Sequence, residues 1–330
     1  MEKILLTLAC MFGMSTATFA YTHSAVMLEH DGVITTYDAE NIGDAVEAAD
    51  DGDVIYLTEG TFSSFDVTKR ISIKGAGQLT KIVGDINIEI PNEPVLSDPV
   101  FEYVNINGYI KVISASRGFK IKQCLVSSVV FFADTYDAYI DRCSITAGTA
   151  SGYNGLNVSY YKEKSVTING YTSKEYIPYV KSLTVTNSKI YSVYGDSSVP
   201  NNTTFVNCHI THIRGCAGNV INSIVNHTDE RYPDYLDNSI FINSCIGDGT
   251  NVDNATNRLT NCYRITESLQ ENVEDLTSLG YLGSDGTVVG TLGGNTPFTL
   301  VPTVPHVTEA NLSVDPQKQE LNVSVTVTPK

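Results

Sequence analysis

The chain has 330 residues, of which 42% are hydrophobic, and its formal net charge is −16 at pH 7. This apolar content is too high for a disordered acidic chain, so we expect a folded acidic protein. The negative charge argues against nucleic acid and anionic membrane surfaces as partners, because both attract basic patches. No segment after the N-terminal stretch is long and apolar enough to predict a membrane span.

Residues 1–20 have the organisation of an export signal. Lys3 supplies the charged start, residues 4–14 form an apolar run too short to span a bilayer, and Ala20 ends a small-residue cleavage site. Cys10 follows a poor match to a lipoprotein signal, so cleavage after Ala20 is favoured over lipidation. The sequence therefore predicts a secreted protein, extracellular or periplasmic, whose mature body begins at residue 21.

The next element that the sequence predicts is a short amphipathic helix at residues 41–49. Ile42, Ala45 and Val46 recur at helical spacing and share one face. The acidic turn at residues 50–53 ends the helix, and strand-like sequence follows. A helix in this place would cover one end of a strand-rich body and shield its unpaired strand edges.

From about residue 119 a short pattern keeps returning: an apolar residue, any residue, Asn or another polar residue, Cys or Ser, any residue, an apolar residue. The intervals between successive Cys or Ser positions run from 15 to 22 residues, apart from one of 45. β-Branched residues alternate within each copy, which favours strands over helices. Such a repeat is typical of stacked coils, in which each strand pairs with the next coil in a parallel ladder. The copies begin at Ile121, Ile140, Val185, Phe205, Val220, Phe241 and Leu259.

The third and fourth positions of each copy predict a bend and a small interior residue. Asn tolerates the left-handed backbone conformation better than any residue except Gly, so the third position predicts a sharp bend between two strands. The Cys or Ser that follows is expected to turn inward as a small filler. A metal site would need paired short spacings such as C-x-x-C, so interior thiols are favoured. A disulfide between Cys208 and Cys216 is disfavoured.

The N-terminal part resembles a known superfamily. Residues 41–77, from Ala45-Val46 through Gly52–Leu57 to Ile73–Gly77, resemble the opening of pectate-lyase-like β-helix proteins, and the Asn-Cys bends resemble their later coils. The resemblance covers roughly residues 33–290. It implies the fold and leaves the function open, because the superfamily includes lyases, hydrolases, adhesins and proteins of unknown role.

We therefore expect an all-β protein, a right-handed parallel β-helix with an N-terminal capping helix and a C-terminal β-hairpin. The β-helix is assigned to residues 21–295. Prolines in residues 296–305 suit an extended segment, and apolar residues alternate on both sides of the turn at residues 315–318. Residues 296–330 are thus expected to form an extended segment and a hairpin that covers the last coil or packs along its side.

Long insertions between the coils suggest where a ligand would bind. Residues 146–182, 191–203, 211–219 and 227–239 follow the apolar ends of several copies, and they are expected to stack as a wall beside an elongated groove. Such a groove suits a polymer, and carbohydrate is the natural candidate.

Tyrosines in the longest insertion and two histidines are the candidate ligand-binding residues. Tyrosine combines an apolar ring with a polar tip, which suits sugar rings, although packing of the loop against the solenoid would also explain these tyrosines. The absence of Trp weakens the sugar-binding interpretation, and the histidines lack a partnered nucleophile. The candidates are Tyr160, Tyr161, Tyr171, Tyr176, His209 and His212.

Residues 227–239 group carboxylates in a way that suits Ca²⁺, although no cofactor is required. Arg231 and Lys181 are candidate catalytic residues of a lyase. Arg231-Tyr232-Pro233 is similar to the start of a pectate lyase motif, but the second Arg of that motif is missing. A solvated, self-paired charge cluster is the alternative interpretation. The candidate metal ligands are Asp229, Glu230, Asp234 and Asp237.

The sequence favours a secreted or cell-surface, monomeric and non-catalytic β-helix protein that binds a glycan or a protein partner. A calcium-dependent polyuronate lyase is the first alternative. A structural or assembly protein, whose terminal hairpin docks on another chain, is the second. A polygalacturonate hydrolase is disfavoured, because the Asn-Thr-Asp, Asp-Asp and Gly-His-Gly motifs of such relatives are missing from the coils.

Overall fold

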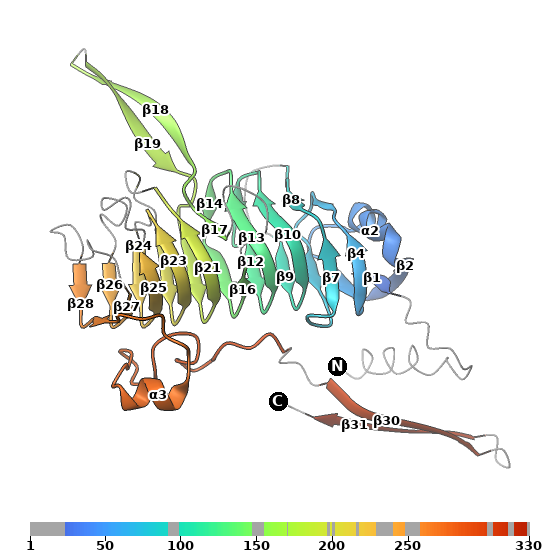
Figure 1. The fold of residues 1–330 in the computed structure, drawn as a ribbon. Helices are drawn as coiled ribbons and strands as arrows, with labels where there is room; N and C mark the ends of the chain where they lie inside the picture. Colours follow the sequence, from blue (N-terminus) through green and yellow to red (C-terminus); the bar gives the residue numbers. More distant parts are fainter. Residues whose placement is uncertain are drawn as a thin grey trace.

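The protein is a stack of parallel β-coils with a helix near its N-terminus (Figure 1). The computed structural model describes residues 24–91, 99–146, 155–169, 171–196, 199, 202–215, 218–228, 240–247, 258–301, 306–315 and 320–328. Within them, no helix is long and apolar enough to cross a membrane. The predicted export signal at residues 1–20 lies outside the described residues.

The first sheet takes one short strand from each coil. From β3 onward its strands pair in parallel, and the register places one inward apolar residue of each coil beside the next, from Ile55 through Phe101, Val185 and Phe205 to Leu259. In spatial order the sheet contains β2 (Val33–Asp38), β1 (Ala25–His30), β3 (Val54–Leu57), β6 (Ser72–Lys74), β9 (Val100–Glu102), β12 (Lys120–Lys122), β15 (Ala138–Asp141), β20 (Leu183–Thr186), β22 (Thr203–Val206), β24 (Gly218–Ile221), β26 (Ile240–Ile242) and β28 (Arg258–Thr260).

The second sheet forms the remaining wall of the core. Several of its strands are longer than the sequence indicated, because the segments expected to begin insertions at 191 and 211 continue as strand to Tyr194 and Arg214. The sheet contains β4 (Gly60–Ser63), β7 (Thr80–Val83), β10 (Asn105–Val112), β13 (Leu125–Phe131), β16 (Ser144–Ile145), β21 (Lys189–Tyr194), β23 (His209–Arg214), β25 (Ile224–Thr228), β27 (Cys245–Ile246) and β29 (Tyr263–Arg264), with β5 (Asp66–Val67), β8 (Ile86–Ile88) and β17 (Leu156–Asn157) beside this path.

Three small two-stranded sheets complete the strands of the described residues. β11 (Ser116–Arg117) and β14 (Thr135–Tyr136) pair in parallel, where the coils return to the first sheet. β18 (Tyr161–Ile168) and β19 (Tyr171–Pro178) form an antiparallel hairpin that projects from the stack (Figure 1). β30 (His306–Asp315) and β31 (Glu320–Thr328) form the predicted C-terminal hairpin, a two-stranded sheet of its own.

The predicted bends are confirmed at every copy of the repeat. Their third residues have φ between 46° and 53°, in the left-handed region. A further bend of this kind lies at Tyr103 (φ 59°). The sequence pattern missed it because Tyr103 and Val104 stand where later coils have an Asn-Cys or Asn-Ser pair. We call the seven predicted bend residues the Asn corner: Gln123, Arg142, Asn187, Asn207, Asn222, Asn243 and Asn261.

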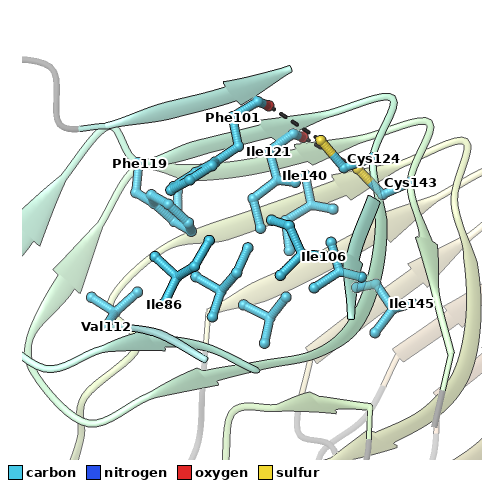
Figure 2. Close-up of a cluster of buried hydrophobic side chains, with 14 of the residues drawn as sticks. Ile86, Phe101, Ile106, Val112, Phe119, Ile121, Cys124, Ile140, Cys143 and Ile145 are labelled. Atoms are coloured by element: carbon cyan, nitrogen blue, oxygen red, sulfur yellow. Dashed lines mark hydrogen bonds between the residues drawn. The ribbon is translucent and has the colours of Figure 1, made fainter. Parts of the chain in front are cut away.

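The residues after these bends point into the core, as predicted. The Cys124 and Cys143 thiols each donate to a carbonyl oxygen of the preceding coil, those of Phe101 and Ile121, at 3.5 Å (Figure 2). Burial raises the pKa of the interior Cys208 thiol to about 12, so the neutral thiol prevails there. The side chains of Cys124, Cys143, Ser188, Cys208, Ser223 and Ser244 are fully buried, and that of Cys262 is partly buried.

Serine at this position ties successive coils together. The Ser223 hydroxyl donates to the carbonyl oxygen of Ile221 at 2.7 Å and accepts the Cys208 N–H at 3.0 Å. In the sixth copy the interior residue is Ser244, whereas Cys245 begins β27 and faces the opposite side of the sheet. Cys208 is a free thiol, and Cys216 lies outside the described residues.

The N-terminal end is closed by more than the predicted helix. α2 (Ile42–Ala48), preceded by the 3₁₀ turn η1 (Ala39–Asn41), buries Ile42, Ala45 and Val46 as expected. The sequence analysis did not anticipate the β1–β2 hairpin, which adds antiparallel strands to the edge of β3. Hairpin and helix together cover the first coil and join the continuous core.

The C-terminal part of the solenoid is covered by residues 265–301, which we call the strap. The strap contains α3 (Val273–Ser278), whose first N–H groups are capped by the Asn272 side chain. Ile265, Leu276 and Val289 of the strap pack on the outward residues Ile224 and Cys245 of the second sheet, forming a separate small core. The strap therefore packs against this part of the solenoid.

The strap runs back toward the N-terminus along the Asn corner. Asn222 Oδ1 accepts the Ser284 N–H at 2.9 Å, Asn187 Nδ2 donates to the Gly293 carbonyl at 2.9 Å, and Gln123 Nε2 donates to the Val301 carbonyl at 2.8 Å. Gly294 has φ 73°, and a Cβ there would come within 2.3 Å of Asn207 Nδ2. The bend side chains thus hold the strap backbone as well as shaping the coils.

Candidate functional site

The Ca²⁺ and lyase candidates of residues 229–239 lie outside the described residues. They are Asp229, Glu230, Arg231, Asp234 and Asp237. Within the described ranges, no group of three or more His, Cys, Asp or Glu side chains is arranged to hold a metal ion.

Lys181, the other catalytic candidate, lies at the base of the β18–β19 hairpin. Its ammonium group contacts the Pro178 carbonyl oxygen and lies 3.4 Å from Asp134 Oδ1. Lys162, at the start of the same hairpin, reaches Asp134 Oδ2 at 2.7 Å. Both lysines thus anchor the hairpin to one carboxylate of the solenoid.

The tyrosines of the long insertion are distributed along the hairpin. Tyr160 packs on Phe132, with ring centroids 4.6 Å apart, and Tyr161 meets Tyr176 edge-on at 5.0 Å. Tyr171 stands near the tip with 84% of its surface exposed. The structure therefore divides the predicted set into packed rings at the base and one open ring near the tip.

His209 lies beneath the strap. Its Nδ1 is 3.4 Å from Glu271 Oε2, and its Nε2 is 2.8 Å from the Asn226 amide nitrogen. Asn226 Oδ1 accepts the Leu269 N–H at 3.1 Å, so the Asn226 amide group donates to Nε2. Nδ1 then carries the proton that faces Glu271, and His209 links the second sheet to the strap.

Glu271 is the most enclosed acid in this region, with 4% of its side chain exposed. Lys189 Nζ lies 3.5 Å from its carboxylate, and the Thr291 hydroxyl donates to it at 2.7 Å. Burial acts to raise the pKa of Glu271, but the hydrogen bonds from His209 and Thr291 outweigh it and hold that pKa below its ordinary value. The carboxylate is therefore ionised at neutral pH and holds the strap in place.

His212 lies on the outer face of the second sheet in a row of aromatic rings. The His212 and His227 rings stack with centroids 5.1 Å apart and an interplanar angle of 23°. Tyr191 meets His212 edge-on at 5.3 Å. We call these three side chains the aromatic ladder. It crosses three successive strands, β21, β23 and β25, and thus runs along the axis of the solenoid.

The aromatic ladder is partly open to solvent and bounded on both sides, and its His227 Nε2 lies 3.0 Å from the Ser268 hydroxyl of the strap. Tyr191 is 50% exposed. Where β21 begins, Lys189 contacts Glu271 and lies over the Phe298 ring of the strap. Where β21 ends, the Tyr194 carbonyl accepts the N–H of Val158, just before the projecting hairpin. The ladder thus occupies a strip between the strap and the hairpin base.

Sequence reasoning singled out His212 and missed its two neighbours in the ladder. Tyr191 follows Ser188 by three residues, while His212 and His227 each follow Cys208 and Ser223 by four. Alignment of the copies on their Cys or Ser position would have placed these three residues in nearly one column. Because Tyr191 is offset by one residue from the two histidines, the three residues do not share one aligned position, and the pattern was missed.

No protein-family model, curated protein or solved structure matches the chain. The geometry of the strip and of the elements beside it is therefore what bears on the function of the protein.

Proposed function

We propose that the protein is a secreted or cell-surface β-helix of the pectate-lyase-like kind, which binds an extended glycan along the aromatic ladder without cleaving it. The observation that carries this proposal is the row of three rings across successive coils, at centroid separations of 5.3 and 5.1 Å. The assignment to the superfamily is supported by the parallel coils with left-handed Asn bends and by the N-terminal helix.

A row of rings suits a chain-like ligand for a physical reason. Aromatic rings bind the apolar faces of sugars, and the Tyr191 phenol can form hydrogen bonds with hydroxyl groups. The His212 and His227 rings stack on each other, and His227 Nε2 lies 3.0 Å from the Ser268 hydroxyl of the strap, so these two rings contribute mainly their outward edges. Strands of neighbouring coils are rigidly spaced, so the rings form a repeating surface that an extended polymer can follow. The strap and the hairpin base limit lateral movement of such a chain.

The proposal is tested by titrating neutral and uronate polysaccharides into the full chain by calorimetry. We expect Tyr191→Ala to weaken binding roughly two- to tenfold, the range that corresponds to loss of one aromatic contact. Tyr171→Ala is the matched variant, because it removes an open tyrosine from the hairpin tip. Unchanged affinity in Tyr171→Ala is expected.

The same titrations are followed for unsaturated product, with Ca²⁺ and with chelator. Calcium-dependent product from a polyuronate would replace this proposal with the lyase alternative. Equal losses in both tyrosine variants would extend the binding surface to the hairpin, and a loss in Tyr171→Ala alone would move it there. Failure of the intact protein to bind any polysaccharide in the panel would remove the glycan proposal altogether.

A further inference from the structure

β2 is the outermost strand of the first sheet, at the N-terminal end of the solenoid (Figure 1). β1 pairs with it along its full length without a register shift. In the part of the chain that the structure describes, no strand pairs with its other edge. Among the described residues, β2 therefore presents an unpaired edge of main-chain donors and acceptors.

The register of the hairpin shows which groups face outward. Asp31 (φ 48°) and Gly32 (φ 77°) form a two-residue turn, so His30 and Val33 are the hydrogen-bonded pair that closes it. Antiparallel pairs alternate between hydrogen-bonded and non-hydrogen-bonded types. Val33, Thr35 and Tyr37 thus direct their N–H and C=O groups to β1, whereas those of Ile34, Thr36 and Asp38 face the open edge.

This edge lacks the usual protection against pairing. The strand reads VITTYD, with high β-propensity and with no Lys, Pro or Gly. Val33 is 65% and Ile34 38% exposed. The projecting β18–β19 hairpin, by contrast, carries the charge pairs Lys174–Glu163 and Lys164–Glu175 across its strands. Charged side chains therefore disfavour strand pairing at the β18–β19 hairpin, whereas the edge of β2 carries no such charge pairs.

We propose that β2 pairs with β2 of a second copy, antiparallel about a two-fold axis, so that the first sheets of two solenoids join end to end. The outward main-chain groups of both strands must face each other. This requires the two-fold axis to pass through a residue, which then pairs with itself in the second copy, and not between two residues. Centring on Thr35 pairs Val33 with Tyr37 and Ile34 with Thr36. The Ile34 and Thr36 pairs then exchange main-chain hydrogen bonds.

Cross-strand chemistry favours this register. It places an aromatic residue beside a β-branched one and the two Thr35 side chains beside each other, combinations that stabilise antiparallel pairs. Asp38 lies opposite Gly32, so the two Asp38 carboxylates stand at opposite ends of the paired strands. Each copy carries a net charge of −16, so we expect association to strengthen as salt screens the long-range repulsion.

The inference is independent of the aromatic ladder and is tested by sedimentation of the full chain over a range of concentrations and salt. A reversible dimer is expected. Thr36→Pro should abolish it, because the Thr36 N–H faces the open edge and its loss leaves the β1 bonds intact. Thr36→Lys gives the same expected result without altering the backbone, and circular dichroism checks that both variants fold.

Cysteine variants test the register. Thr35→Cys brings two thiol-bearing Cβ atoms to about 5 Å across the axis, so an intermolecular disulfide should form on oxidation. Val33→Cys is the matched control, because its two copies would stand roughly 14 Å apart. A wild-type chain that stays monomeric at all concentrations, equal cross-linking of both variants, or association only with a strand of another protein would overturn the proposal. The sequence-based expectation of a monomer is the opposing prediction.

Discussion

The Asn residues of the bends combine two roles in one side chain. Their left-handed backbone conformation turns the chain between the two sheets, and their amides reach outward to the strap. Asn187 illustrates both, with φ 46° and a 2.9 Å hydrogen bond to the Gly293 carbonyl. Its side chain is buried, so loss of the amide would leave the Gly293 carbonyl without that donor.

Substitution of Asn187 separates these roles. Asn187→Gly keeps the bend and loses only the hydrogen bond, so we expect it to lower the free energy of unfolding by about 1 kcal/mol. Asn187→Ala also strains the backbone, and the expected loss is about 2–3 kcal/mol. Urea unfolding monitored by circular dichroism measures both. Equal losses would show that the bend conformation contributes little.

At the residue scale, the sequence was informative where a backbone conformation or an interior position accepts only a few residue types. Asn at the bends and Cys or Ser after them were predictable because few residues tolerate those positions. Tyr103 shows the limit, since it adopts the left-handed conformation without being a residue type that favours it.

Among the elements, the strap depends on one buried carboxylate. Glu271 links Lys189 and His209 of the second sheet to Thr291 of the strap. Its pKa in the folded protein is below the ordinary value of 4.5. The stabilisation from this ionised group is therefore fully present above pH 4.5 and is lost as pH falls through the lower folded-state pKa.

We expect the strap to detach in acid before the coils unfold. Hydrogen-exchange protection of residues 283–301, corrected for the intrinsic exchange rate at each pH, should fall from about pH 6 downward as Glu271 becomes protonated. Glu271→Gln should exchange faster at neutral pH and show a weaker pH dependence. Glu267→Gln, which changes an exposed carboxylate of the same segment, is the control. Matching profiles for wild type and Glu271→Gln would contradict the assignment.

The elements that sequence analysis missed share a physical reason. The strap is rich in Gly, Ser, Asp and Thr, and much of its placement comes from backbone bonds to side chains of the Asn corner, which no local pattern announces. The β1–β2 hairpin is short and lies outside the repeat. The aromatic ladder arises only when separate copies are stacked in register. Each of these features depends on contacts between distant residues, which a local pattern does not record.

On the scale of the whole molecule, one core runs through the stack. Buried side chains connect continuously from Val26 in the N-terminal hairpin to Ile246 in a late coil. Near its centre, Phe119 meets Phe101 and Phe131 edge-on, with ring centroids 6.2 and 6.4 Å apart (Figure 2 shows the first pair). All three rings are fully buried in the cores of neighbouring coils.

Truncation of the Phe119 side chain tests how far a local loss of packing spreads along the stack. We expect Phe119→Ala to lower the free energy of unfolding by about 3–5 kcal/mol, because it opens a cavity between two other rings. Phe119→Leu should cost less, since most of the volume is kept. Hydrogen exchange should show the loss concentrated in the adjacent coils, because each coil contacts only its neighbours. Uniform acceleration throughout the stack would indicate a single cooperative unit instead.

The direction in which the strap runs has a consequence for folding during synthesis. Synthesis proceeds from the N-terminus, so the coils can stack in the order in which they emerge. The side chains of Gln123, Asn187 and Asn222 nevertheless receive their strap partners only after residues 284–301 have followed. A chain interrupted before that point would keep an uncovered seam of amides and apolar residues along one side. The strap is therefore added only after all the coils that it covers, and chains that end before it would leave this surface exposed to proteolysis.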